Sequence, residues 1–160
     1  MIHRLELSNN YFMKNFLLIK IFAIYLFLIS NGMTKQSDYF DKGIELFQKK
    51  EFDKSKILFE KDIVFNPKNE KSYLYLAKNF REKNKNVQQE IKLNSVLLLN
   101  PQNAEAIYML ALLKIKQSDY NHAKKLLDEF VLVCKSFCSK KKEIQEKFEK
   151  MTPENAKNNN

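Results

Sequence analysis

The sequence predicts an all-α protein: a short α-solenoid of about three antiparallel helix–turn–helix repeats, closed by a C-terminal capping helix. Similar residues recur every 34 positions along most of the chain, and the apolar residues between the turn signals have helical spacing. The chain of 160 residues has only 2 Gly and 3 Pro, which leaves little room for the turns of a β-rich fold.

The first 32 residues are predicted to be a signal peptide. Residues 16–29 are apolar apart from Lys20, Lys14 precedes them, and a Ser-Asn-Gly sequence follows at 30–32. A basic start, a short apolar core and small residues at the exit are typical of a secretory signal peptide. The apolar run is shorter than the roughly 20 residues that a membrane span needs.

We therefore expect cleavage near Gly32 and a periplasmic or exported protein. Two alternatives stay open: an uncleaved leader that anchors the chain to the inner membrane through residues 11–30, and a buried first helix of the fold. Met13 is followed by Lys and Asn, a more usual signal start than Met1. The start of the natural leader is therefore open too.

The repeat domain is predicted to span residues 37–151, with repeats at about 36–69, 70–103 and 104–137. Asn-Pro pairs at 66–67 and 100–101 end two of the helices, because the residue before proline resists the helical conformation. The expected helices are 38–50 and 54–65, 70–83 and 87–99, and 104–117 and 120–133.

A last amphipathic segment, residues 140–151, is predicted to be the capping helix. Its apolar residues Ile144, Phe148 and Met151 are spaced by four and three positions, and charged residues fill the gaps. A terminal helix needs such a polar outer face because no further repeat covers it. The polar tail, 152–160, is predicted to be disordered.

Four columns of residues carry the period. A bulky column is followed by a small one, and a second small column in the second helix is followed by another bulky one. They are Tyr39, Tyr73 and Ile107; Gly43, Ala77 and Ala111; Ser55, Gln89 and Ala123; and Phe59, Leu93 and Leu127.

This pattern resembles the tetratricopeptide repeat, in a protein of the exported bacterial type. The resemblance covers about residues 37–133 and implies stacked helical hairpins in which a small residue admits the partner helix's large one. Gln89 departs from the pattern, and residues 84–90 are weakly apolar, so the second helix pair is expected to be splayed or irregular. The third repeat has Lys135 in place of the closing proline.

The two cysteines, Cys134 and Cys138, lie at the junction of the third repeat and the cap. An even number in an exported protein favours a disulfide. Two cysteines in one continuous helix are poorly placed for a bond, but a helix that ends near Ser136 lets the sulfurs turn toward each other. We therefore predict a disulfide that fixes the cap. A metal site would need more ligands than two cysteines. A covalent haem site would need His at position 139, where the chain has Ser139, and a redox dithiol usually has a shorter spacing.

The net charge of +9 raises the possibility of a nucleic-acid partner. Almost all of the positive charge is Lys, spread over every predicted helix among Asp and Glu, whereas Arg is the better phosphate ligand. The basic run at 140–142 is the main argument on the other side. We expect no nucleic acid to bind.

No catalytic site is expected. Two glycines cannot build a phosphate loop. His122 is expected at the surface near the start of a helix, and the acidic residues occupy polar helix faces where Lys residues can pair with them. We predict no enzyme activity, no cofactor and no metal.

The resemblance implies a binding groove lined by the first helices of successive repeats. By their phase, the candidate contact residues mix apolar, aromatic and cationic side chains, which suits an acidic peptide or protein partner. The family's clamp for a C-terminal carboxylate is not expected, since Phe40 and Ile44 replace its Lys and Asn. The candidates are Phe40, Ile44, Phe47, Lys71, Leu74, Tyr75, Lys78, Arg81, Tyr108, Met109, Leu112 and Lys116.

Three functions remain open at this point. The first is an exported interaction module, a scaffold or adaptor. The second is an accessory subunit of an envelope enzyme or secretion complex, and the third is a cytoplasmic nucleic-acid-binding protein. Another possibility for the apolar groove residues Phe40, Ile44 and Phe47 is contact with residues 33–37 or with a second copy of the chain.

Overall fold

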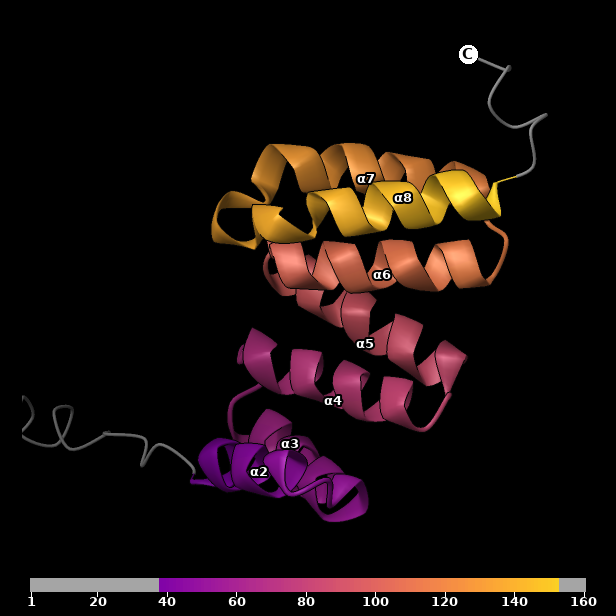
Figure 1. The fold of residues 1–160 in the computed structure, drawn as a ribbon. Helices are drawn as coiled ribbons and strands as arrows, with labels where there is room; N and C mark the ends of the chain where they lie inside the picture. Colours follow the sequence, from indigo (N-terminus) through magenta and orange to yellow (C-terminus); the bar gives the residue numbers. More distant parts are fainter. Residues whose placement is uncertain (1–37, 153–160) are drawn as a thin grey trace, which may run out of the picture. The chain divides into compact units, whose positions relative to one another are not determined.

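The computed structural model describes residues 38–152, and in this part of the chain every regular element is a helix. The predicted fold class, a short all-α solenoid with a C-terminal cap, is confirmed (Figure 1). The elements are α2 (Tyr39–Gln48), α3 (Phe52–Phe65), α4 (Glu70–Glu82), α5 (Asn86–Leu99), α6 (Ala104–Lys116), α7 (Tyr120–Val133), the 3-10 helix η1 (Lys135–Lys140) and α8 (Lys141–Met151).

The predicted leader, residues 1–32, lies outside the described residues, as do residues 153–160 of the predicted tail. The predictions for these two segments therefore stay predictions. Within residues 38–152, no helix is both long and apolar enough to cross a bilayer.

The helices form three hairpins that follow one another through the stack: α2 with α3, α4 with α5, and α6 with α7 (Figure 1). The second helix of each hairpin packs on the first helix of the next, and α8 lies against α6 and α7. Two predicted boundaries are off by two residues: α2 ends at Gln48 rather than Lys50, and α3 begins at Phe52 rather than Lys54. Phe52 packs edge-on against Phe47, with ring centroids 5.4 Å apart, so the chain resumes a helix after a very short turn.

Small residues occupy the close helix contacts. Ala77 and Ala111 are fully buried, and Gly43 is buried beneath the ring of Phe59. A Cβ atom at Gly43 would lie 2.6 Å from that ring, closer than packed side chains allow. The smallest residue of the column therefore faces the largest partner.

The second hairpin is regular, so the expectation of a splayed or irregular helix pair is wrong. The helix α5 runs without interruption, and α4 packs closely on it. Gln89 is buried where the pattern favours a small residue, but its side chain lines a pocket at one end of the hairpin. A long side chain is accommodated there because the pocket leaves room beside it.

The turn inside each hairpin uses the same left-handed backbone at positions 34 apart. Lys50, Asn84 and Ser118 have φ values of 61°, 54° and 60°. In the first turn, the Lys50 N–H donates to the Phe47 carbonyl and the Glu51 N–H donates to the Leu46 carbonyl. The other two turns repeat this pair of bonds, a Schellman motif that usually has glycine at the left-handed position.

Glycine should therefore stabilise these turns. We expect Lys50→Gly and Ser118→Gly each to raise the free energy of unfolding by roughly 0.5–1 kcal/mol, the left-handed penalty less the added chain entropy. Lys49→Gly is the matched control, because Lys49 has φ −75° and gains no such relief. Urea denaturation measures all three, and a loss of stability in both turn variants would contradict this account.

The buried side chains form two clusters. Phe59, Leu76 and Phe80 make a small one between the first two hairpins. A larger cluster joins the second hairpin, the third hairpin and the cap, where Ile144 of α8 is fully buried. Phe148 also packs on this cluster, so two of the three apolar residues predicted for the cap are in the core, whereas Met151 is half-exposed.

The cysteines lie where α7 gives way to η1. Cys134 and Cys138 are at disulfide-bonding distance, with Cα atoms 4.8 Å apart. The change from α-helix to 3-10 helix directly after Cys134 lets the two side chains meet, as the predicted helix end near Ser136 required. Phe137, inside this loop, packs edge-on against Tyr108 and Phe130.

Candidate functional site

The predicted groove residues of α2 and α4 include a cluster of aromatic rings. The ring centroid of Tyr75 lies 5.8 Å from Phe40, 5.4 Å from Phe47 and 5.2 Å from Phe59. The Lys78 ammonium lies 4.6 Å from the Tyr75 centroid, a cation–π contact. Phe40 and Phe47 therefore pack against other side chains of this chain, and both stay partly exposed.

The other predicted groove residues differ in how much surface they offer to a partner. That these residues contact a partner stays a prediction. Three are exposed, Lys71, Arg81 and Lys116; two are half-buried, Ile44 and Leu112; and three are buried, Leu74, Tyr108 and Met109.

Tyr108 helps to dock the cap. Its hydroxyl donates a hydrogen bond to Glu143 Oε1 of α8 at 2.7 Å, and its ring packs on Phe137. Burial, with the hydrogen bond to Glu143 as a smaller cause, raises the pKa of Tyr108 to about 12. Hydrogen bonds from Lys140 and then from Tyr108 lower the pKa of Glu143. The exposed Glu143 carboxylate of α8 is thus held charged and ties the cap to α6.

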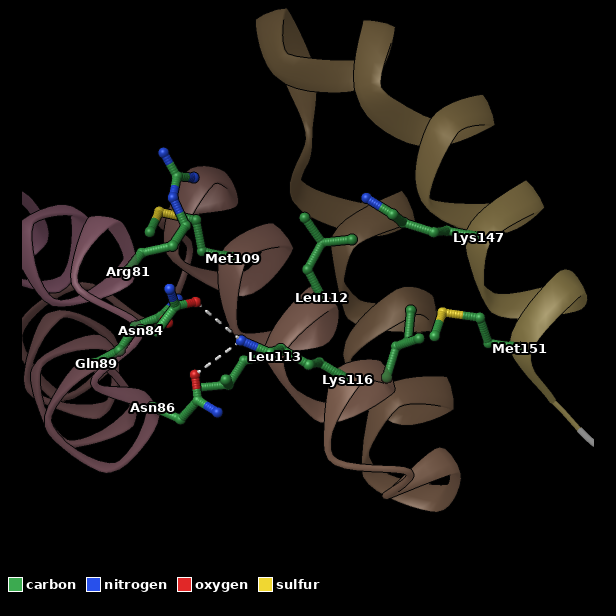
Figure 2. A pocket seen from close by; sticks show the side chains of 11 residues that line it. Arg81, Asn84, Asn86, Gln89, Met109, Leu112, Leu113, Lys116, Lys147 and Met151 are labelled. Carbon is green, nitrogen blue, oxygen red and sulfur yellow. Dashed lines mark hydrogen bonds between the residues drawn. The ribbon is translucent and has the colours of Figure 1, made fainter.

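A pocket opens beside the predicted groove, between the α4–α5 turn and α8, with α6 as its floor (Figure 2). We call it the α6 pocket; its volume is about 280 Å³. Four residues of α6 supply most of its apolar lining, and Met151 of α8 adds to it. The lining residues are Arg81, Asn84, Asn86, Gln89, Met109, Leu112, Leu113, Ile115, Lys116, Lys147 and Met151.

The charges around the α6 pocket are all positive. Arg81, Lys116 and Lys147 line it, and no Asp or Glu does. Lys116 donates hydrogen bonds to the amide oxygens of Asn84 and Asn86, at 3.4 and 3.2 Å (Figure 2). Figure 2 shows the Lys147 side chain reaching from α8 toward α6. The pocket therefore joins an apolar floor to a cationic rim.

The repeat phase predicts only part of this pocket. Arg81, Met109, Leu112 and Lys116 were candidates by their phase in the repeat. The contribution of α8 was missed because a capping helix has no fixed phase relative to the repeats. The one signal in the sequence is Lys147, a basic residue on the polar face of the amphipathic capping helix.

A second surface feature lies on the second helices of the hairpins and was also missed. Val64, Leu98 and Leu132 occupy one repeat position, 34 residues apart, and are 77%, 84% and 83% exposed. Polar residues are the usual occupants of such exposed helix positions. The period therefore extends to a row of solvent-facing aliphatic side chains.

The potential metal ligands do not cluster in the part of the chain that the structure describes. Within residues 38–152, no cluster of three or more His, Cys, Asp or Glu residues could hold a metal ion. His122 is exposed, as predicted, and its Nδ1 lies 2.6 Å from a carboxylate oxygen of Asp119, which caps the start of α7. The contact between His122 and Asp119 is therefore part of the N-terminal cap of α7.

Comparisons with solved structures identify the fold. The chain is similar to the TPR domain of Arabidopsis OM64, with a TM-score of 0.68, 18% identity, and coverage of 76% of this chain and 100% of that one. It is also similar to the TPR2B domain of yeast Sti1 in its complex with pHsp70, with a TM-score of 0.64, 18% identity, and coverage of 72% of this chain and 97% of that one.

A third similar structure is the first TPR of Spaghetti (RPAP3) bound to the HSP90 peptide SRMEEVD. The TM-score is 0.64, with 16% identity and coverage of 71% of this chain and 90% of that one. No family model matches the sequence, and no curated protein matches it. Likeness at these identities establishes the fold alone: three hairpins of the tetratricopeptide type, followed by a cap.

Proposed function

We propose that this protein is an exported interaction module, a scaffold or adaptor that binds a peptide or protein partner on the face formed by α2, α4 and α6. The observation that carries the proposal is the composition of that face. Partly exposed aromatic rings and exposed Lys and Arg side chains lie on the helices that line the groove in this architecture, and the α6 pocket opens beside them. Similar domains solved with an HSP90 peptide and with pHsp70 support it.

Site-specific photo-cross-linking tests the location of the partner. A photoreactive amino acid at Ile44 or Lys71 lies on the proposed face, and the matched controls are Glu60 of α3 and Lys125 of α7, both exposed. We expect cross-links to a partner protein from the first pair and none from the second. Cross-links from the control positions alone would exclude the groove.

The identity of the cross-linked partner separates an adaptor from an accessory subunit. An accessory subunit should cross-link to an envelope enzyme or to a component of a secretion complex, in a fixed ratio. An adaptor should yield two or more partners that compete for the same positions. The proposed face is the same in both cases, so both outcomes follow from one experiment.

We further propose that the module works outside the cytoplasm. The basic, apolar and small-residue segments of residues 1–32 support this, and the cysteine pair at bonding distance is compatible with an oxidising compartment. Fractionation followed by N-terminal sequencing tests it. A mature chain starting after Gly32 is expected. A membrane-bound chain that keeps its leader would favour the anchor, and a full-length chain in the cytoplasm would reject export.

A further inference from the structure

We propose that the α6 pocket binds an acidic segment of the partner, which places one aliphatic side chain on α6 and carboxylates beside Lys116 and Lys147. The inference deepens the proposed function and rests on it, because it names the chemistry of the partner. Three properties of the pocket carry it: its size, its apolar floor and its unbalanced charge.

The size suits a side chain. Pockets that enclose small-molecule ligands usually measure about 300–1,000 Å³, and the α6 pocket, at about 280 Å³, falls just below that range. Its floor is aliphatic and thioether in character, from Met109, Leu112 and Met151 among others. Methionine side chains adapt to the shape of an inserted group, so leucine, isoleucine or methionine would fit equally well.

The positive charge at the rim of the α6 pocket favours acidic residues on either side of the inserted apolar one. Among the described residues, no carboxylate lies within ion-pair distance of Lys116 or Lys147, whereas Lys78 and Lys83 each have one and Lys114 has two. Arg81 pairs with the adjacent Glu82 at 3.2 Å, so it contributes less free positive charge. Two ammonium groups on opposite sides of an apolar floor attract a segment with acidic residues around its apolar one, and repel a basic segment.

The same cations could attract nucleic-acid phosphates, but the lining favours a protein segment. Single-stranded nucleic acids bind by stacking their bases on aromatic rings. None of the residues that line the α6 pocket is aromatic. The aromatic cluster of Phe40, Phe47 and Tyr75 is on α2 and α4 and does not line the pocket. A base would find no stacking surface in the pocket.

Fluorescence anisotropy with a labelled synthetic peptide, one leucine flanked by glutamates, tests the proposal. We expect the full chain to bind it, and Lys116→Glu and Lys147→Glu each to weaken binding roughly three- to tenfold by losing an attraction and adding a repulsion. Lys147→Gln should have a smaller effect. Lys125→Glu is the matched control: it makes the same change in net charge at an exposed position of α7 and should leave binding within about twofold.

Two further probes separate charge from shape. Replacing the glutamates of the peptide by glutamine, or its leucine by serine, should each abolish most of the binding. Equal binding by the wild type and by the double variant Lys116→Glu, Lys147→Glu would overturn the pocket as the site. Tighter binding of a single-stranded oligonucleotide with the same variant profile would also overturn the proposal, by making the pocket a nucleic-acid site.

The outcome can be told apart from failure of the proposed function. Both lysines are exposed, so circular dichroism should show unchanged helicity in these variants. If Ile44 and Lys71 still cross-link a partner while the lysine variants bind the peptide normally, the groove stands and the pocket proposal fails. If neither experiment detects binding, both fail.

Discussion

Phe59→Ala is expected to remove about 3–5 kcal/mol from the free energy of unfolding, the usual cost of truncating a fully buried phenylalanine. Phe59 is fully buried, its ring covers Gly43, and it stacks on Tyr75. The substitution therefore opens a cavity where the first hairpin meets the second. The structure there has few other large buried side chains, since Leu76 and Phe80 complete that cluster.

Urea denaturation followed by circular dichroism measures this effect, and hydrogen exchange locates it. In a solenoid each hairpin contacts only its neighbours, so loss of amide protection should be greatest in α2 and α3. Ile57→Ala on the same helix is the control, because Ile57 is 51% exposed and should cost less than about 1 kcal/mol. Equal effects of the two substitutions would contradict the packing described here.

Ile144→Asp is expected to release the cap. Ile144 is fully buried between α8 and the main cluster, so the loss of its side chain alone should cost at least about 2 kcal/mol, and a buried carboxylate adds to that cost. With α8 undocked, Tyr108 loses both its burial and its bond to Glu143. Its pKa should then fall from about 12 toward the ordinary value of 10.0.

The raised pKa also fixes the direction of the pH dependence. The docked cap holds the phenol proton more tightly than the undocked one, so this contribution is complete below pH 10 and is lost as the pH rises toward about 12. Spectroscopic titration of tyrosinate measures the shift. Gln145→Asp, at an exposed position of α8, is the control and should leave it unchanged. An unshifted tyrosine titration in Ile144→Asp would contradict the docking role.

The sequence predicts those features that a single repeat can encode. The column of Gly43, Ala77 and Ala111 predicts the hairpin contacts, and the Asn-Pro pairs predict where α3 and α5 end. The sequence does not predict the left-handed turns, because Lys50 and Ser118 occupy positions where glycine is the usual signal for such a turn. Their conformation is imposed by the two hairpin helices, against the preference of the residues.

The sequence does not predict the complete α6 pocket, for a different reason. Lys116 and Lys147 are brought to one hollow only when α8 docks on α6, and that docking depends on Tyr108, Ile144 and the turn at η1. No periodic pattern relates these residues. The repeat phase therefore predicts the packing of the hairpins but says nothing of how the cap docks at the end of the stack.

The two sulfurs at the start of the cap have a consequence for biogenesis. With only 2 Cys in the chain, an intramolecular bond can form in one way alone, between neighbours that the end of α7 already places together. Oxidative folding of a monomer thus requires an electron acceptor but no disulfide isomerase, because no scrambled isomer exists to be corrected.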